Sequence, residues 1–205
     1  MFRRIMIYIL AALALLLIPA LWWLYTPDQP RAALEARYAA APSQFLEVEG
    51  LRLHLRDTGP RAAPAVIFLH GFGSSLHTWD DVAQGLEGEF RIIRLDLPGF
   101  GLTGADPTGD YTDERAAVIL LAVMGRLGLE RAALVGSSMG GRIAWRFAAA
   151  HPERVTRLVL MAPDGFASPG IGYEQPPRVP LLMRALPYTL PDALLRPSLT
   201  PAYGN

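Results

Sequence analysis

The chain has 205 residues, with 19 basic and 19 acidic side chains, so its formal net charge is zero. This balance gives no electrostatic reason to expect nucleic acid as a partner. The sequence contains no cysteine, which excludes disulfides, thiolate metal sites and a cysteine nucleophile. The length is sufficient for one domain with a sizeable core.

The chain begins with a long apolar segment. Residues 5–25 carry no charge, and Arg3 and Arg4 precede them. As a helix, this run would span roughly 30 Å, about the thickness of the hydrocarbon core of a bilayer. The tryptophan pair at residues 22–23 lies where an aromatic belt would meet the membrane interface. Residues 1–25 are therefore predicted to be an uncleaved signal anchor, with the two arginines on the cytoplasmic side.

Two other interpretations of this segment stay open. A cleaved signal peptide would have an apolar core of about 7–15 residues with a small-residue cleavage site close behind it. This run is longer and ends in bulky aromatic residues. A buried core helix would show a polar face. As an anchor, the segment implies a membrane-bound protein, expected in a bacterial inner membrane with the following domain on the periplasmic or outer side.

Residues 26–44 are predicted to form a linker, because prolines bracket a short stretch rich in Ala, Arg and Glu that could form a helix. From Phe45 the pattern changes, and apolar residues alternate around Gly50, which predicts two strands joined by a turn. Four short apolar runs follow, typical of strands that are buried on both faces of a parallel sheet. They cover residues 66–69, 91–95, 132–135 and 158–161.

Helices are predicted between these runs, at residues 76–86, 113–127 and 139–150. Strands that alternate with helices indicate an α/β fold with a doubly wound, mostly parallel sheet, which we place at residues 45–165. In residues 166–205 prolines become dense and no further strand pattern is found. This last segment is predicted to be the start of a cap or lid, with a short helix near residues 181–185.

The segment Gly136-Ser137-Ser138-Met139-Gly140 lies where a predicted strand ends and a predicted helix begins. A tight strand-to-helix turn can hold a serine on strained backbone and expose its hydroxyl above the sheet. Such a turn leaves little room for side chains two residues on either side, and Gly136 and Gly140 occupy these positions. Ser138 is therefore predicted to be a catalytic nucleophile, with an ordinary glycine-rich turn as the alternative.

Two backbone amides are candidates for an oxyanion hole beside Ser138. The amide of Met139 lies at the N-terminus of the predicted helix, where free N–H groups and the helix dipole favour negative charge. The second donor should come from a loop after an earlier strand. The loop at residues 70–73 offers the amide of Phe72. His70 is predicted to brace this loop rather than to act as the base.

These motifs resemble those of the α/β-hydrolase superfamily. Four segments match in the order and approximate spacing of the family, and the resemblance covers about residues 45–165. Within the superfamily, the chain is similar to the branch with a helical cap after the sixth strand, which includes esterases, lipases and carbon–carbon bond hydrolases. The matching segments are His70-Gly71-Phe72-Gly73, Asp96-Leu97-Pro98-Gly99-Phe100-Gly101, Gly136-Ser137-Ser138-Met139-Gly140 and His151-Pro152-Glu153-Arg154-Val155.

The resemblance implies a serine hydrolase that acts on a small ester or related carbonyl substrate through an acyl-enzyme at Ser138. It implies oxyanion donors at Phe72 and Met139, and neither a metal nor a cofactor. Relatives with epoxide hydrolase or dehalogenase activity typically have Asp at the elbow, so the serine argues against those reactions.

The acid and the histidine of the family's triad usually follow the seventh and eighth strands. We therefore expect both residues beyond Asn205. The chain itself is then expected to be an N-terminal fragment, with a C-terminally incomplete fold and no activity of its own. Asp164 could be an acid placed early, although a turn residue is the favoured interpretation.

Three other functions stay open. Residues 99–104 match the dinucleotide-binding fingerprint, but that fingerprint requires a helix that begins within it, and no helix is predicted before about Thr112. A non-catalytic, membrane-anchored binding module is a second alternative, since fold alone does not establish chemistry. A cofactor-free perhydrolase is the third, because it would use the same triad. The sequence indicates no oligomeric state.

Overall fold

The computed structural model describes residues 2–165, 180–185, 188, 189, 191, 193, 195 and 197. The chain divides into two compact units, one formed by Met1–Pro30 with Glu174–Asn205 and the other by Arg31–Tyr173. Most of the predicted cap lies outside the described residues.

The first unit contains one long helix. This helix, α1, covers Phe2–Leu24, and none of its residues is buried. Its length and apolar composition are those of a helix that can cross a membrane, and a signal sequence has the same properties. The short helix predicted near residues 181–185 is present as α6, Leu181–Ala185.

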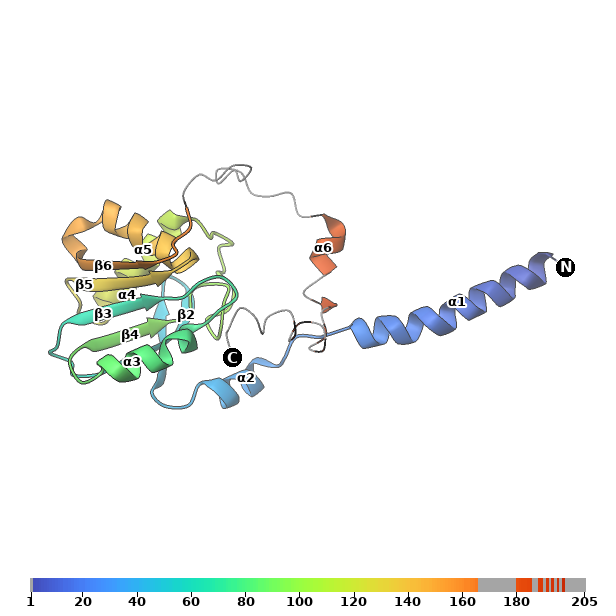
Figure 1. Cartoon of the computed structure of the whole chain (residues 1–205), viewed down its shortest axis with the longest axis horizontal. Helices are drawn as coiled ribbons and strands as arrows, with labels where there is room; N and C mark the ends of the chain where they lie inside the picture. Colours follow the sequence, from blue (N-terminus) through green and yellow to red (C-terminus); the bar gives the residue numbers. More distant parts are fainter. Residues whose placement is uncertain are drawn as a thin grey trace. The chain divides into compact units, whose positions relative to one another are not determined.

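The second unit is built on a six-stranded sheet with the strand order β1-β2-β4-β3-β5-β6 (Figure 1). β2 is antiparallel to both of its neighbours, whereas β4, β3, β5 and β6 pair in parallel. The predicted mostly parallel sheet is therefore confirmed. The strands are β1 (Ser43–Val48), β2 (Leu51–Thr58), β3 (Ala65–Leu69), β4 (Arg91–Leu95), β5 (Ala132–Ser137) and β6 (Val155–Met161).

Helices cover both faces of this sheet, with α4 and α5 on one face and α3 on the other (Figure 1). The helix predicted at residues 76–86 is a 3-10 turn, η1, followed directly by α3. The helices of this unit are α2 (Arg31–Tyr38), η1 (Leu76–Trp79), α3 (Asp80–Leu86), α4 (Asp113–Arg126), α5 (Met139–Ala150) and η2 (Pro152–Arg154).

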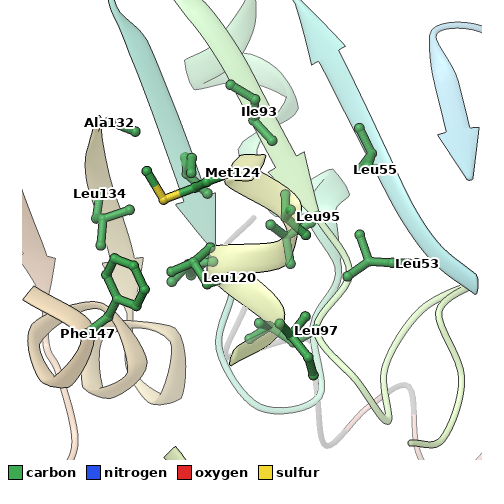
Figure 2. Packing of buried hydrophobic residues seen from close by; sticks show 14 of the residues in the cluster. Leu53, Leu55, Ile93, Leu95, Leu97, Leu120, Met124, Ala132, Leu134 and Phe147 are labelled. Atoms are coloured by element: carbon green, nitrogen blue, oxygen red, sulfur yellow. The ribbon is translucent and has the colours of Figure 1, made fainter. Parts of the chain in front are cut away.

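Alternate residues of the central strands enter two different cores, as the two-residue period of a strand requires. Ile67 and Leu69 of β3 pack on the side of α4 and α5. Val66 and Phe68 pack against Trp79 on the opposite face. Figure 2 shows the larger core, in which leucine and isoleucine side chains of β2, β4 and β5 converge on α4 and α5. This packing fixes the helices relative to the carboxyl ends of the parallel strands.

The helix α2 lies inside the segment predicted to be a linker, but it belongs to the second unit, which begins at Arg31. Arg31 Nη2 donates to the Leu102 carbonyl at 2.7 Å, and Arg52 Nη1 donates to Glu35 Oε1 at 2.5 Å. The predicted boundary at residue 45 therefore lies inside the compact unit. Neither hydrophobic core includes a residue of this helix, and its contacts with β2 and the β4 loop are polar, so the sequence has no apolar stripe to mark it.

Candidate active site

Ser138 occupies a tight turn between β5 and α5. Its backbone has φ 50° and ψ −118°, a conformation that side-chain-bearing residues rarely adopt and that costs about 1–3 kcal/mol. Three hydrogen bonds hold it there. Ser138 N donates to the Met161 carbonyl at 3.0 Å, and the Ser138 carbonyl accepts from Arg142 N at 3.0 Å and from Asp164 N at 3.3 Å. The turn therefore has the strained, braced geometry of a nucleophile elbow.

The glycines around Ser138 are required by close backbone approach. A Cβ on Gly136 would lie 2.7 Å from the Gly141 Cα atom, and a Cβ on Gly140 would lie 2.5 Å from the His70 carbonyl oxygen. A Cβ on Gly71 would lie 3.3 Å from the Ser138 Cβ atom. The loop after β3 thus passes directly beside the serine, as the sequence predicts.

The two predicted oxyanion donors lie on these two neighbouring segments. Met139 is the first residue of α5, and the hydrogen-bond pattern of that helix begins only with Arg142 N, which donates to the Ser138 carbonyl. Within the described part of the chain, no acceptor is found for the amide of Met139 or of Phe72. Both residues line one cavity. Their role in stabilising an oxyanion stays a prediction.

His70 is buried and braces the loop after β3. Its Nδ1 lies 2.8 Å from the Gly71 carbonyl oxygen, and its Nε2 accepts from Leu97 N at 3.0 Å. The acceptor role of Nε2 places the proton of the neutral ring on Nδ1. Burial lowers the pKa of His70, while the Gly71 carbonyl and the charge of Asp96 partly oppose this. The imidazole thus ties the β3 and β4 loops together, as predicted.

Asp96, at the end of β4, is a buried carboxylate whose structural role was not predicted from the sequence. Its carboxylate accepts from Leu76 N at 2.7 Å, from Leu102 N at 2.8 Å and from His54 Nδ1 at 2.7 Å. Burial alone would raise its pKa, but the bonds from His54 and the two amides outweigh burial and hold the pKa below its usual value. Its position directly after a buried strand marks Asp96 as a candidate in the sequence, but the sequence does not show which groups it contacts.

The remaining candidate groups have other partners. His77 Nδ1 lies 2.9 Å from Asp80 Oδ2. His151 follows the last residue of α5, a helix of 12 residues, so it lies on the order of 18 Å from Ser138. Asp164 Oδ1 accepts from Arg142 Nε at 2.9 Å. A carboxylate held by a guanidinium is poorly placed to orient a histidine, which favours the structural interpretation of Asp164.

A cavity of about 550 Å³ opens beside the elbow. Phe72 and Met139 line its near side, and residues of the β4 loop, α4 and α5 complete it. Among the described residues there is no cluster of three or more His, Cys, Asp or Glu side chains that could hold a metal ion.

The dinucleotide fingerprint at residues 99–104 lies in a turn that no helix follows closely. A Cβ on Gly101 would overlap the Asp96 carboxylate, so this glycine is needed for the loop itself. The next helix, α4, begins at Asp113 with Thr112 as its cap. The match to the fingerprint is therefore accidental, because no helix begins within it.

Comparison with known proteins identifies the family. The sequence model of the alpha/beta hydrolase fold matches residues 64–195, and the chain belongs to this family. It is 40% identical over 131 residues to a 2-hydroxy-6-oxononadienedioate/2-hydroxy-6-oxononatrienedioate hydrolase of Paraburkholderia phymatum. This match covers 60% of this chain and 45% of the relative. It is 36% identical over 128 residues to the dihydrolipoyllysine-residue acetyltransferase component of the acetoin cleaving system of Cupriavidus necator, covering 62% and 34% of the two chains.

Solved structures show the same fold. A bacterial membrane phospholipase A, described as a virulence factor, superposes with a TM-score of 0.60 at 27% identity. The match covers 81% of this chain and 52% of the phospholipase chain. This chain thus spans about half, or less, of the length of the proteins it matches.

Proposed function

We propose that the protein is a serine hydrolase of the α/β type that transfers an acyl group to Ser138 and then to water. The observation that carries this proposal is the conformation of Ser138. A residue with φ 50° at the junction of β5 and α5 is strained, and the close packing of Gly136 and Gly140 maintains it. Strain that the surroundings hold in place is characteristic of functional sites.

In the proposed mechanism, Ser138 Oγ attacks a carbonyl carbon while a base removes the hydroxyl proton. The carbonyl oxygen becomes an oxyanion and accepts hydrogen bonds from the amides of Phe72 and Met139. Collapse of the tetrahedral intermediate expels the leaving group with a proton from the base and leaves an acyl-enzyme. Water then cleaves the acyl-enzyme and restores the serine. Epoxide hydrolases of this superfamily typically have Asp at the elbow, so Ser138 favours acyl transfer over that reaction.

The base in this proposal is a histidine outside the described residues. His54 and His70 are buried and hydrogen-bonded to other groups, while His77 and His151 lie beside other carboxylates. None of these four side chains contacts Ser138 Oγ in the described part of the chain.

The relatives support the class of reaction more than the substrate. Their names describe a dioate hydrolase, an acetyltransferase component and a phospholipase A. Because these names differ, the likeness supports a hydrolase of the α/β type without selecting a substrate.

We also propose that α1 anchors the protein in a membrane. Phe2–Leu24 is long and apolar enough to span a bilayer. Arg3 and Arg4 at its start favour a cytoplasmic N-terminus. The catalytic unit would then lie on the periplasmic or outer side.

The test combines turnover with covalent labelling of the complete protein. Wild type should hydrolyse p-nitrophenyl butyrate and react with a fluorophosphonate probe at Ser138, identified by peptide mass spectrometry. Ser138→Ala should lose both the label and at least about a thousandfold of the rate. Ser137→Ala, a matched change at the adjacent residue, should still be labelled at Ser138.

Either of two results would overturn this assignment. Turnover that survives in Ser138→Ala, or a label on a different residue, would show that another group is the nucleophile. A folded wild-type protein with neither turnover nor label would instead support a non-catalytic binding module.

A further inference from the structure

The cavity beside the elbow has a mostly apolar wall. Phe72 and Phe100 stack edge to face with their ring centroids 5.6 Å apart, and both line the cavity. Leu97, Ile119 and Ile143 continue the wall toward the larger core. The same three residues also border a void of about 20 Å³ beneath it, lined by apolar residues alone. This lining suits a hydrocarbon chain.

Two arginines reach the cavity, and carboxylates hold both. Arg142 Nη1 lies 2.6 Å from Asp113 Oδ1, and Arg142 Nε lies 2.9 Å from Asp164 Oδ1. Arg115 Nε lies 2.9 Å from Asp106 Oδ2, and its Nη2 donates to the Glu49 carbonyl at 2.7 Å. Each guanidinium is therefore neutralised before any substrate enters.

Asp113 is the carboxylate at the centre of this arrangement. It lines the cavity, pairs with Arg142 through Oδ1 and pairs with Arg146 through Oδ2 at 3.0 Å. Only 12% of its side chain and 25% of that of Arg142 are exposed. In such partly buried surroundings, a substrate carboxylate without a free cation would lose hydration and gain no partner.

We propose that this cavity binds the uncharged acyl chain of a neutral ester, and that Asp113 sets this preference by neutralising Arg142. The proposal rests on the acyl transfer to Ser138 proposed above and adds the substrate class and a specificity-determining residue. An ester whose acyl chain ends in a carboxylate is disfavoured, because the arginine that could bind it is already paired.

Two esters of equal chain length test the preference. p-Nitrophenyl hexanoate and mono-p-nitrophenyl adipate differ in the terminal group, which is a methyl in one and a carboxylate in the other. For the complete wild-type protein, we expect kcat/KM to be at least about tenfold higher for the hexanoate, the effect of leaving one charged group without a partner. Equal rates, or a faster adipate, would overturn the proposal.

The role of Asp113 is tested by Asp113→Asn, which keeps the shape of the side chain and removes its charge. The ratio of hexanoate to adipate kcat/KM should fall by about fivefold or more, since Asp113 then no longer compensates Arg142 and Arg146, and the site gains a net positive charge that favours the adipate carboxylate. Asp81→Asn, an equal change in net charge on the exposed side of α3, should leave the ratio as in wild type. An unchanged ratio in Asp113→Asn would overturn the assignment of this residue.

The ratio is measured on one preparation, so loss of folded protein lowers both rates and leaves the ratio intact. If Asp113→Asn does not fold, Asp164→Asn removes the other carboxylate on Arg142. The ratio should fall in the same direction, while both individual rates also change because Asp164 braces the elbow. Failure of the two proposals is distinguishable. A protein that hydrolyses neither ester and takes no label at Ser138 refutes the proposed function, whereas a labelled protein that prefers the adipate refutes the specificity alone.

Discussion

Replacing Gly140 by alanine tests whether the close contact between α5 and the end of β3 positions Ser138. A Cβ at residue 140 would lie 2.5 Å from the His70 carbonyl oxygen and would also overlap the Leu69 carbonyl. Real Cβ atoms essentially never come closer than 3.0 Å. Both obstacles are backbone atoms that cannot rotate away, so the start of α5 must move by roughly 0.5 Å or more, the difference between these two distances.

The expected magnitude follows from this displacement. Overpacking of a close contact costs about 1–3 kcal/mol, and the better helix propensity of alanine returns up to about 1 kcal/mol. The free energy of unfolding should therefore fall by up to about 3 kcal/mol. Because Ser138 directly precedes α5, the same movement displaces its Oγ from the oxyanion donors. A misplacement approaching 1 Å lowers kcat/KM by about 10- to 100-fold.

Urea denaturation followed by tryptophan fluorescence and turnover of p-nitrophenyl butyrate measure the two effects. The matched control is Gly125→Ala in α4, where a new Cβ meets nothing within 4 Å. This control should gain about 0.5–1 kcal/mol from helix propensity and keep its activity. Wild-type stability and activity in Gly140→Ala, or equal losses in both variants, would refute the reasoning.

Two further predictions concern the β4 loop and the anchor. Asp96→Asn should lower the free energy of unfolding by about 2–4 kcal/mol at pH 7, because an amide nitrogen cannot accept from His54 Nδ1 and Leu102 N. The pKa of Asp96 is lowered in the folded state, so this stabilisation is present above its ordinary value of 3.8 and is lost as pH falls through the folded value. Wild type and variant should therefore converge in urea titrations from pH 7 toward pH 3, and a constant gap would count against the argument. The protein should stay in the membrane fraction after alkaline carbonate extraction, and deletion of Phe2–Leu24 should release it; a mature N-terminus beyond Tyr25 would show a cleaved signal instead.

The fold of the second unit could be predicted because its signals are local. Each central strand is a short apolar run that the two-residue period divides between two cores, and α4 begins directly after the capping residue Thr112. The elbow could be predicted for the same reason. Gly136, Ser138 and Gly140 are close in sequence, and the turn that they form has no room for a Cβ atom at either glycine.

Contacts between distant polar residues could not be predicted in this way. His54 and Asp96 are 42 positions apart, and Arg52 lies 17 positions from its partner Glu35 in α2. No periodic pattern marks such pairs. In the sequence, a charged residue of a strand or a short helix is the same letter at the same position whether its side chain faces solvent or a buried partner. The docking of α2 and the organising role of Asp96 therefore emerged only from the structure.

The pairing of Arg142 connects the geometry of the nucleophile with the charge of the cavity. Arg142 N and Asp164 N both donate to the Ser138 carbonyl, and the side chains of these two residues pair with each other. Neutralisation of the guanidinium by Asp164 and the bracing of the elbow are thus parts of one structure, and a change at Asp164 affects both. Asp113 has no contact of this kind with Ser138 and meets Arg142 only through the side chain. A change in selectivity in Asp113→Asn therefore reports the charge of the cavity, whereas Asp164→Asn should alter the chemical step as well.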